Sequence, residues 1–370
     1  MTKINHIYIH VPFCKRVCPY CDFYKTTSFK LIPEYLEALK KELQIKKKLF
    51  GSVRTLYIGG GTPSSIGEYL SRFFEIISKA FDMEKLSEFT IEVNPEDVTE
   101  ELIETLQKHG VNRISLGVQS FSKEKQKFLN RQTPSVNKNA LKLLKDFPNV
   151  SCDLIYGIYR DTISKLKSDV KIIKRYNVKH LSFYSLIIEE NTKFYKDYHS
   201  GKKVKLSEDK ETRIYHKMVK YIEKLGYKQY EISNFAVPGY ESKHNLCYWH
   251  YDDFLNFGPG AVGFYLGSRY VNPRSLHEYS KEFPKNFYLK EKLSSKDEEE
   301  EFVMMGLRLK EGVSVSKFKE RFGEDIFTAF PKFKEAISKK HIILEDNYLR
   351  IDPKYFYVSN HIIKEVLDWQ

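Results

Sequence analysis

The sequence predicts an α/β protein, with a full or partial barrel of parallel strands or an open doubly wound sheet, followed by a smaller C-terminal domain. Two observations carry this prediction. Six short, nearly continuous apolar segments alternate with amphipathic helical segments between residues 4 and 187. This alternation is typical of parallel strands joined by right-handed helical crossovers. The C-terminal residues instead combine helices with one hairpin.

The predicted strands are rich in β-branched and aromatic residues. They lie at residues 4–11, 54–58, 88–93, 113–118, 150–156 and 178–187. The helices between them carry leucine and isoleucine at helical spacing, and Thr99 has the position of an N-cap. These helices are predicted at residues 32–49, near 66–80, directly after Thr99, near 122–129, at 135–146 and near 162–175.

After residue 190 the alternation of strands and helices ends. A helix is predicted at 207–225 and a strand at 227–236, and a glycine-rich aromatic segment runs from Phe254 to Phe264. Helices resume near residue 295, and Ile342–Leu344 and Tyr348–Ile351 are expected to form a hairpin. This mixture predicts a small, mostly helical, winged-helix-like C-terminal domain. We therefore divide the chain into residues 1–235, 236–290 and 291–370.

The composition is typical of a soluble globular protein, with 41% hydrophobic and 30% charged residues. No apolar run is long enough to cross a membrane, and the N-terminal residues do not match a secretory signal peptide, so we expect a cytoplasmic protein. The net charge of +12 raises the alternative of nucleic-acid binding. Because the lysines are spread along the whole chain, we expect no nucleic-acid partner; a strong, salt-dependent affinity for RNA would favour that rival.

Three of the five cysteines, Cys14, Cys18 and Cys21, lie within eight positions directly after the first predicted strand. In a chain with no export signal, thiolates at this spacing indicate a soft metal or an iron–sulfur cluster rather than disulfides. Three ligands leave one iron of a four-iron cluster open for another group. A zinc site completed by His10 or Asp22 is the alternative.

Other unusual residues also fall where predicted strands end, which is the edge at which parallel α/β folds gather their chemistry. The glycine-rich stretch Gly59–Ser64 follows the second strand, Glu92 ends the third and Gln119 ends the fourth. Glycines let a backbone approach a ligand closely. A carboxylate inside an apolar strand, as at Glu92 and Asp153, requires a partner. We therefore predict a single site at this edge.

The spacing of Cys14, Cys18 and Cys21 after a strand resembles that of the radical S-adenosylmethionine (SAM) superfamily. The resemblance implies a partial (β/α)6 barrel, a [4Fe–4S] cluster on these three cysteines, and SAM on the fourth iron. More closely, the chain is similar to the group that contains oxygen-independent coproporphyrinogen III oxidase and the haem chaperones of the HemW type. The stretches that carry this resemblance are Tyr8–Phe23, Gly59–Ser64, Ile91–Pro95, Leu116–Phe121, Asn130–Arg131, Asp153–Gly157, His244–Trp249 and Gly306–Leu309.

In that group, SAM contacts would fall on positions within the same stretches. They are Tyr8, Tyr20, Gly60, Glu92, Gln119, Arg131 and Asp153, with Gly61 and Thr62 bordering a second SAM-sized site. After the residues that match Asp153–Gly157, the group usually continues Leu-Pro-x-Gln-Thr, whereas this chain has Ile158-Tyr159-Arg160-Asp161-Thr162. We therefore assign no SAM contact to that loop.

Two features match the chaperone branch of the group. Its decarboxylases carry CxxxCxxCxC, but here Phe23 stands at the position of the fourth cysteine. His244, Tyr248 and Trp249 match the HNxxYW motif of the chaperones, and an imidazole beside flat rings suits haem iron and its macrocycle. On residue type alone, His244 also fits a hydrogen-bonded histidine in an aromatic core. Cys247 is a second candidate haem ligand.

The resemblance implies a haem chaperone that binds haem, a [4Fe–4S] cluster and SAM and transfers haem to an acceptor protein. The alternative is the coproporphyrinogen III oxidase reaction, in which SAM is cleaved at the cluster and its radical starts a decarboxylation. For the chaperone we assign no catalytic residue. The acceptor is an unidentified protein, and any membrane contact is expected to be peripheral and to come through that acceptor.

Overall fold

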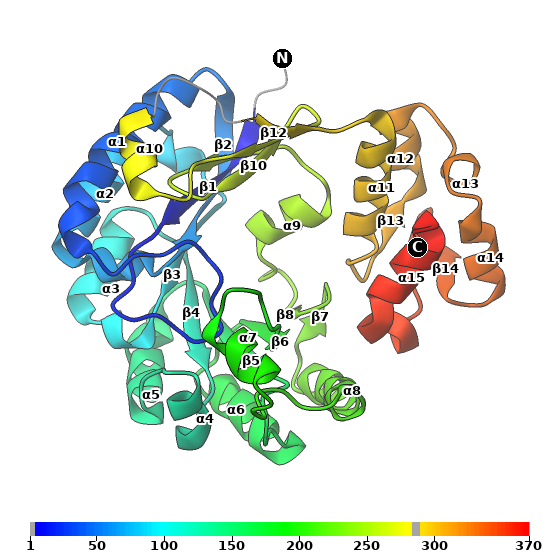
Figure 1. Ribbon diagram of the computed structural model, residues 1–370, viewed down its shortest axis with the longest axis horizontal. Coiled ribbons are helices and arrows are strands. Elements are labelled where there is room, and N and C mark those ends of the chain that lie inside the picture. The colour runs from blue at the N-terminus through cyan, green and yellow to red at the C-terminus, as the bar shows by residue number, and fades with distance from the viewer. Residues whose placement is uncertain (1–3, 283–288, 370) are drawn as a thin grey trace.

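The centre of the fold is a curved sheet (Figure 1). The computed structural model describes residues 4–282 and 289–369. Within these residues, one twelve-stranded sheet has the order β12-β11-β10-β9-β1-β2-β3-β4-β5-β6-β8-β7. Its middle six strands are parallel: β1 (Ile4–Val11), β2 (Phe50–Gly60), β3 (Glu88–Val93), β4 (Arg113–Gln119), β5 (Val150–Tyr156) and β6 (His180–Ser185). The predicted α/β fold with six parallel strands is confirmed.

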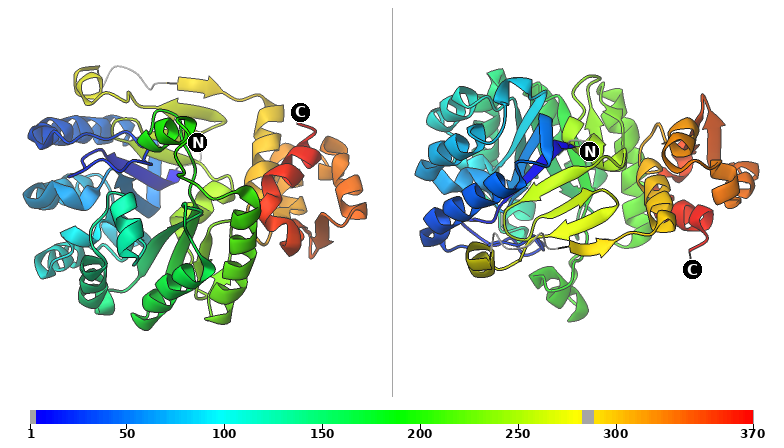
Figure 2. Two further views of the ribbon diagram at one scale, coloured as in Figure 1. Left: turned by 60° about the horizontal axis from the view of Figure 1, so that its bottom comes forward. Right: turned by 90° about the horizontal axis from the view of Figure 1, so that it is seen from above.

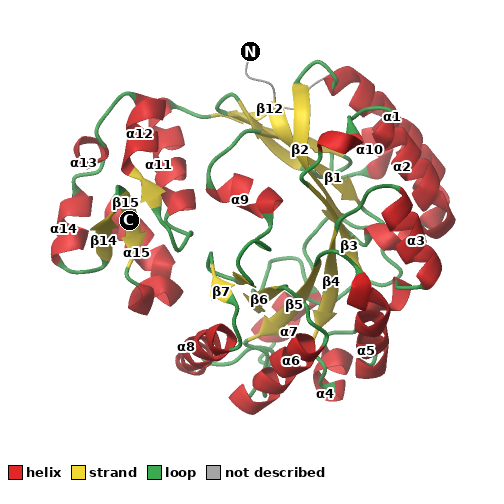
Figure 3. Ribbon diagram, turned by 180° about the vertical axis from the view of Figure 1, so that it is seen from behind, coloured by secondary structure: helices red, strands yellow, loops and turns green. Residues whose placement is uncertain are grey.

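Helices cover the convex face of this sheet (Figure 3). The outer helices are α1 (Ile32–Lys46), α2 (Leu70–Ser78), α3 (Glu100–Lys108), α4 (Lys123–Phe128), α5 (Pro134–Leu143), α6 (Ile163–Arg175) and α8 (Glu208–Lys224). Thr99 caps α3 as predicted, because its Oγ1 accepts a hydrogen bond from the amide of Leu102 at 3.1 Å. No helix in the described ranges has the length and apolar content needed to cross a bilayer.

Short 3-10 helices and one further α-helix fill the connections. The 3-10 helices are η1 (Phe29–Leu31), η2 (Pro63–Tyr69), η3 (Met83–Lys85), η4 (Pro95–Asp97), η5 (Leu144–Asp146) and η6 (Pro353–Val358). The α-helix is α7 (Lys193–His199), which the sequence analysis did not anticipate. It follows β6 at the carboxyl end of the sheet, where it packs against the cysteine loop described below.

The barrel is partial because its end strands pair with later segments rather than with each other. On one side, β6 pairs in antiparallel fashion with β8 (Asn234–Ala236), which in turn pairs with β7 (Lys228–Gln229). The prediction of one strand at 227–236 is therefore wrong. The chain reverses within this segment, where the amide of Tyr230 donates to the Asn234 carbonyl at 3.1 Å.

On the other side, β1 pairs in parallel with β9 (Phe254–Phe257). The glycine-rich aromatic segment continues as strands β10 (Val262–Tyr265) and β11 (Ser268–Val271), joined by β12 (Leu289–Lys292). The sequence did not predict these strands, because they are only four residues long and glycines separate them. Gly258 has a φ of +88°, and a Cβ there would lie 2.2 Å from the His10 carbonyl oxygen, so glycine permits the close approach to β1.

The C-terminal residues form a compact unit beside the open side of the sheet (Figure 2). It contains α11 (Ser295–Gly306), α12 (Val315–Phe322), α13 (Ile326–Ala329), α14 (Lys332–Ser338), α15 (Ser359–Leu367), and a small sheet of β13 (Val313–Ser314), β15 (Tyr348–Ile351) and β14 (Ile342–Glu345). The predicted hairpin is present as the antiparallel pair β14–β15. Val303, Phe318 and Phe333 lie in the core of this unit.

The segment between the sheet and this unit contributes to both cores. Leu255 and Phe257 pack in the core of the large sheet, whereas Tyr251 and Phe264 pack in the core of the C-terminal unit. The segment also contains α9 (Lys243–Trp249), which lies on the concave side of the sheet, and α10 (Leu276–Glu282) (Figure 3). Residues 283–288 of the predicted segment 236–290 lie outside the described residues.

A buried carboxylate joins α1 to the β9–β11 side of the sheet. Glu42 is fully buried, and it accepts hydrogen bonds from the amide of Gly258 at 2.8 Å, the side-chain amide of Asn272 at 2.8 Å and the hydroxyl of Tyr279 at 2.6 Å. It also forms an ion pair with Lys46, whose ammonium donates to the Asn256 carbonyl at 2.8 Å. One side chain on α1 thus holds a segment more than 200 positions further along the chain.

We expect Glu42→Ala to lower the free energy of unfolding by about 3–5 kcal/mol, because it leaves a buried ammonium and several buried donors without their carboxylate. The measurement is urea-induced unfolding. The control is Glu37→Ala on the same helix, whose ion pair with Arg72 is half exposed and should contribute far less. Equal losses in the two variants would contradict this account of α1.

Candidate functional site

The three clustered cysteines lie in the loop that leaves β1. Backbone hydrogen bonds close this loop at its base: the amide of Cys14 donates to the Thr26 carbonyl at 3.0 Å, and the amide of Thr26 donates to the Pro12 carbonyl at 2.7 Å. Cys14, Cys18 and Cys21 are free thiols. They line one cavity of about 590 Å³ at the carboxyl ends of the parallel strands, which we call the cysteine cavity.

Hydrogen-bond donors lie close to the sulfur atoms. The Thr62 hydroxyl lies 3.6 Å from Cys14 Sγ, and Nη1 of Arg131 lies 3.6 Å from Cys18 Sγ. Burial raises the pKa of the Cys14 thiol to about 11 and also raises the pKa of Cys21, so metal binding must displace protons. The donors and the nearby guanidinium would stabilise the resulting thiolates. This set of residues fits an iron–sulfur cluster held by three cysteines.

The alternative zinc site loses one of its two proposed fourth ligands. The ring of His10 has Nε2 2.8 Å from the Tyr24 carbonyl oxygen and Nδ1 3.1 Å from the Tyr8 hydroxyl. Burial lowers the pKa of His10 to about 4, and its side chain lines a second cavity rather than the cysteine cavity. Asp22 does line the cysteine cavity, but its side chain is half exposed. His10 instead ties β1 to the far end of the cysteine loop.

Most of the residues predicted to contact SAM lie together around the cysteine cavity. Those on its wall are Tyr20, Gly60, Gly61, Thr62, Glu92, Gln119, Arg131 and Asp153. Tyr8 lies apart from them, because it lines the second cavity. The structure thus places cysteines, glycines and charged residues from six different segments at one edge, while their contacts with SAM stay a prediction.

The glycine-rich stretch at the end of β2 holds the start of the cysteine loop through backbone hydrogen bonds. The amides of Gly61 and Thr62 donate to the carbonyls of Val11 and Phe13 at 2.9 and 2.8 Å, and the amide of Gly60 donates to Glu92 at 3.0 Å. The sequence analysis expected these glycines to let the backbone approach a ligand. Their close approach is to the loop: a Cβ on Gly61 would lie 2.8 Å from the Phe13 carbonyl oxygen.

Two buried carboxylates face the cavity from β3 and β5. Glu92 accepts hydrogen bonds from the Tyr57 hydroxyl at 2.9 Å and from the amide of Gly60. Burial raises the pKa of Glu92 to about 7, against the opposing effect of the Tyr57 hydrogen bond. Burial also raises the pKa of Asp153, whose carboxylate accepts from the Ser115 hydroxyl at 3.2 Å. Glu92 therefore changes charge near neutral pH more readily than an exposed carboxyl.

Arg113 lines the same cavity, and the sequence analysis did not select it. It begins β4, only 2% of its surface is exposed, and its Nε has no hydrogen-bond partner within the described residues. Its positive charge lowers the pKa of both Glu92 and Asp153 against the larger effect of burial. The sequence contained a signal for Arg113, because a positive charge inside an apolar strand requires a partner just as a negative charge does.

Arg131 and Tyr20 hold the cysteine loop in place as well as lining the cavity. Arg131 Nη2 donates to the Asn94 side chain at 2.7 Å and to the Gly117 carbonyl, so the guanidinium connects β3, β4 and the loop. The ring of Tyr20 packs against Phe194 on α7, at 6.2 Å between centroids. The amide of Phe194 also donates to the Pro19 carbonyl at 2.9 Å. The unpredicted helix α7 is therefore part of the support for the loop.

The HNxxYW residues form α9, and its histidine faces the sheet rather than either cavity. His244 is fully buried, with Nδ1 2.7 Å from the Thr55 hydroxyl and Nε2 2.7 Å from the Tyr248 hydroxyl. Both ring nitrogens are thus engaged, as in the alternative of a hydrogen-bonded core histidine. Haem ligation by His244 stays a prediction, and it requires at least one of these hydrogen bonds to break. Cys247 is also buried.

The comparisons with known proteins identify the family. A model described as the radical SAM superfamily matches residues 8–173, and one described as the HemN C-terminal domain matches residues 293–356. The heme chaperone HemW of Lactococcus lactis is 37% identical over 99% of this chain and 98% of its own length. The heme chaperone HemW of Bacillus subtilis is 35% identical over 91% of this chain and 92% of its own. The chain belongs to the HemW family.

A solved structure supports the same fold for this HemW-family chain. Coproporphyrinogen III oxidase (HemN) from Escherichia coli, described as a radical SAM enzyme, matches with a TM-score of 0.84 and 21% identity. The match covers 100% of this chain and 91% of that chain. The radical SAM match implies a [4Fe–4S] cluster and SAM, and the cysteine cavity has the thiols and polar groups that both require.

We expect SAM affinity to increase between about pH 6 and about pH 8 as Glu92 loses its proton, since its pKa is about 7 and a carboxylate holds ammonium or hydroxyl groups more tightly than a carboxylic acid. Calorimetric titration of the cluster-loaded protein measures this. Glu92→Gln keeps the shape but cannot ionise, so it should bind SAM weakly and lose the part of the pH dependence that belongs to Glu92. The same pH dependence in both proteins would contradict the assignment.

Proposed function

We propose that this HemW-family protein binds haem and transfers it to an acceptor protein while it holds a [4Fe–4S] cluster and SAM. The observation that carries the proposal is Phe23, which exposes 66% of its surface where the decarboxylases of the group have a fourth cysteine. A phenyl ring neither ligates a metal nor transfers a proton, but it offers a flat apolar face to a macrocycle. The full-length relatives named heme chaperones support the same proposal.

In this proposal the cysteine cavity is the cofactor site. Cys14, Cys18 and Cys21 would hold the cluster, and their three thiolates would leave one iron for SAM. The chain's own part would be to orient SAM with the carboxyl groups of Glu92 and Asp153 and with the guanidinium of Arg131, which lies near the sulfurs. None of these residues is required to transfer a proton for haem carriage, so we assign no catalytic residue.

The partners follow from the same proposal. A carrier must release haem, so the acceptor is a protein that binds haem more tightly than the carrier does. We place the exchange in the cytoplasm, because reduced thiols suit cluster assembly there. If the acceptor lies at a membrane, contact with that surface would be peripheral and would come through the acceptor.

A second candidate function is the decarboxylation of coproporphyrinogen, and the fold shared with HemN favours it. For that reaction Cys14, Cys18 and Cys21 would hold the cluster, and the bound cluster and SAM would supply the radical chemistry that removes a hydrogen atom from a propionate side chain. The loss of carbon dioxide would also require an electron acceptor, which takes up the remaining electron. The two candidates differ in what happens to the tetrapyrrole, which is carried unchanged in the first and loses carbon dioxide in the second.

We expect the anaerobically reconstituted protein to bind haem at close to one equivalent and to leave coproporphyrinogen III unchanged in the presence of SAM and a reductant. Titration followed by haem absorbance measures the first, and chromatography of the porphyrinogen products measures the second. The Escherichia coli oxidase assayed in parallel is the positive control for turnover. Oxidative decarboxylation by this protein, or the absence of haem binding, would contradict the proposed function.

A further inference from the structure

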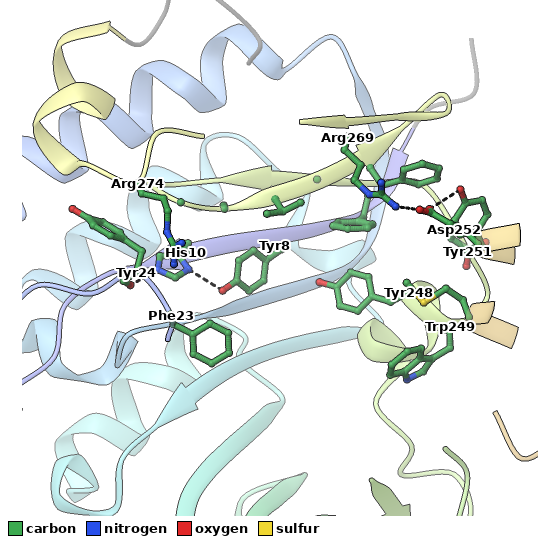
Figure 4. A pocket seen from close by; sticks show the side chains of 18 of the residues that line it. Tyr8, His10, Phe23, Tyr24, Tyr248, Trp249, Tyr251, Asp252, Arg269 and Arg274 are labelled. Carbon is green, nitrogen blue, oxygen red and sulfur yellow. Dashed lines mark hydrogen bonds and ion pairs between the residues drawn. The ribbon is translucent and has the colours of Figure 1, made fainter. Parts of the chain in front are cut away.

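A second cavity adjoins the cysteine cavity, and no residue predicted to hold the cluster lines it (Figure 4). Its volume of about 540 Å³ lies within the range of roughly 300–1,000 Å³ that is typical of small-molecule sites. Residues from β1, the cysteine loop, α9, β9 to β11 and α11 contribute to its wall. We call it the aromatic cavity.

The aromatic cavity is lined mainly by flat rings. They include Phe23, Tyr24, Tyr248, Trp249, Phe254 and Phe264, which come from the cysteine loop, from α9 and from β9 and β10. Phe23 and Val262 leave large apolar surfaces uncovered beside the cavity, with 66% and 46% of each residue exposed. Aromatic walls around a space of this size suit a planar apolar molecule.

Charge distinguishes the two ends of the aromatic cavity. Figure 4 shows Arg274 at one end, beside His10 and Tyr24, and Arg269 at the other, near Tyr251 and Asp252. Arg269 forms ion pairs with both Glu291 and Glu301. Because Asp252 and Glu301 also line the cavity there, the Arg269 end carries more negative than positive charge.

The Arg274 end is the one suited to an anion. Arg274 is 65% exposed, and it donates to the Asp22 carbonyl at 3.0 Å, with the Asp22 carboxylate 3.9 Å away. Lys25 does not belong to this end, because it lines the cysteine cavity and donates to the carbonyls of Cys21 and Phe23 at 2.8 and 3.0 Å. One exposed guanidinium, with the Asp22 carboxylate nearby, therefore marks the Arg274 end.

We propose that the aromatic cavity is the haem site, with the macrocycle against Phe23 and the rings of α9 and β10, and with the propionates directed to Arg274. This inference rests on the proposed function, and it names the place and orientation of the cargo. Haem carries both propionates on one edge and apolar groups on the opposite edge. That asymmetry matches a cavity whose cationic end is open and whose other end is acidic and packed against the C-terminal unit.

The location also explains how one chain holds two ligands of different chemistry. Asp22 and Phe23 line both the cysteine cavity and the aromatic cavity, so the cysteine loop forms the partition between them. In this arrangement haem lies against the side of the cysteine loop that faces the aromatic cavity, and Phe23 is the loop residue that contacts the haem.

The test is haem affinity of the cluster-loaded, full-length protein, measured by absorbance titration. We expect Arg274→Glu to weaken haem binding at least about tenfold, the loss typical of one charge-assisted contact. Haem dimethyl ester, which has no propionate charge, should bind wild type and Arg274→Glu equally. The control is Arg72→Glu, the same charge change at another half-exposed arginine, which should leave haem affinity unchanged.

A second variant tests the cavity itself rather than its charge. Val262→Trp fills space from an exposed position on β10, so it should reduce the bound haem while the cluster absorbance is retained. If wild type binds haem and both Arg274→Glu and Val262→Trp bind it equally well, the haem site lies elsewhere and only this inference fails. If wild type does not bind haem, the proposed function itself fails.

Discussion

The close packing of two glycines against His10 is the constraint on which the site depends. Gly60 at the end of β2 and Gly258 after β9 both have positive φ, and a Cβ on either would lie within 2.5 Å of a His10 atom. The strands β2 and β9, which pair with β1 on its two sides, are thus followed by backbone that packs closely against the last residues of β1 before the cysteine loop. The His10 ring then reaches the carbonyl of Tyr24, beyond the third cysteine. The loop is held at both ends by a residue that contributes no ligand.

This constraint places two cavities on opposite sides of one loop. The cysteine cavity has buried charges of both signs, with Arg113, Glu92 and Asp153 on its wall. The aromatic cavity is lined by many aromatic rings, with the exposed Arg274 beside Asp22 at one end and the acidic Asp252 and Glu301 at the other. A polar, charged cofactor and a flat apolar macrocycle need these different surroundings. The cysteine loop, between β1 and η1, separates the two cavities, and its residues Asp22 and Phe23 line both.

The parallel sheet was predictable because its signals are local. Each apolar strand and each periodic helix can be recognised within a dozen residues, and the chemistry at their carboxyl ends follows from the topology. The same reasoning selected Glu92 and Asp153. It should also have selected Arg113, a charge at the start of an apolar strand that the sequence reading treated as part of the strand only.

The parts that sequence reasoning missed depend on distant partners. The strands β9 to β11 exist because β1 offers an edge about 250 positions earlier, and Gly258 fits against His10 only there. His244 matched a motif associated with haem, but its two nitrogens bind Thr55 and Tyr248, which no local pattern reveals. Tyr8 lines the aromatic cavity, whereas Tyr57, its partner in the register of β1 and β2, lines the cysteine cavity, so the side chains of neighbouring strands divide between the two cavities.

A crystal structure of the protein loaded with both the cluster and haem tests the central claim most directly. The account predicts a porphyrin in the aromatic cavity, in contact with Phe23, with its propionates at Arg274 and with the cysteine cavity free for SAM. A porphyrin inside the cysteine cavity would contradict it. So would a porphyrin ligated by His244 after α9 has moved away from Thr55.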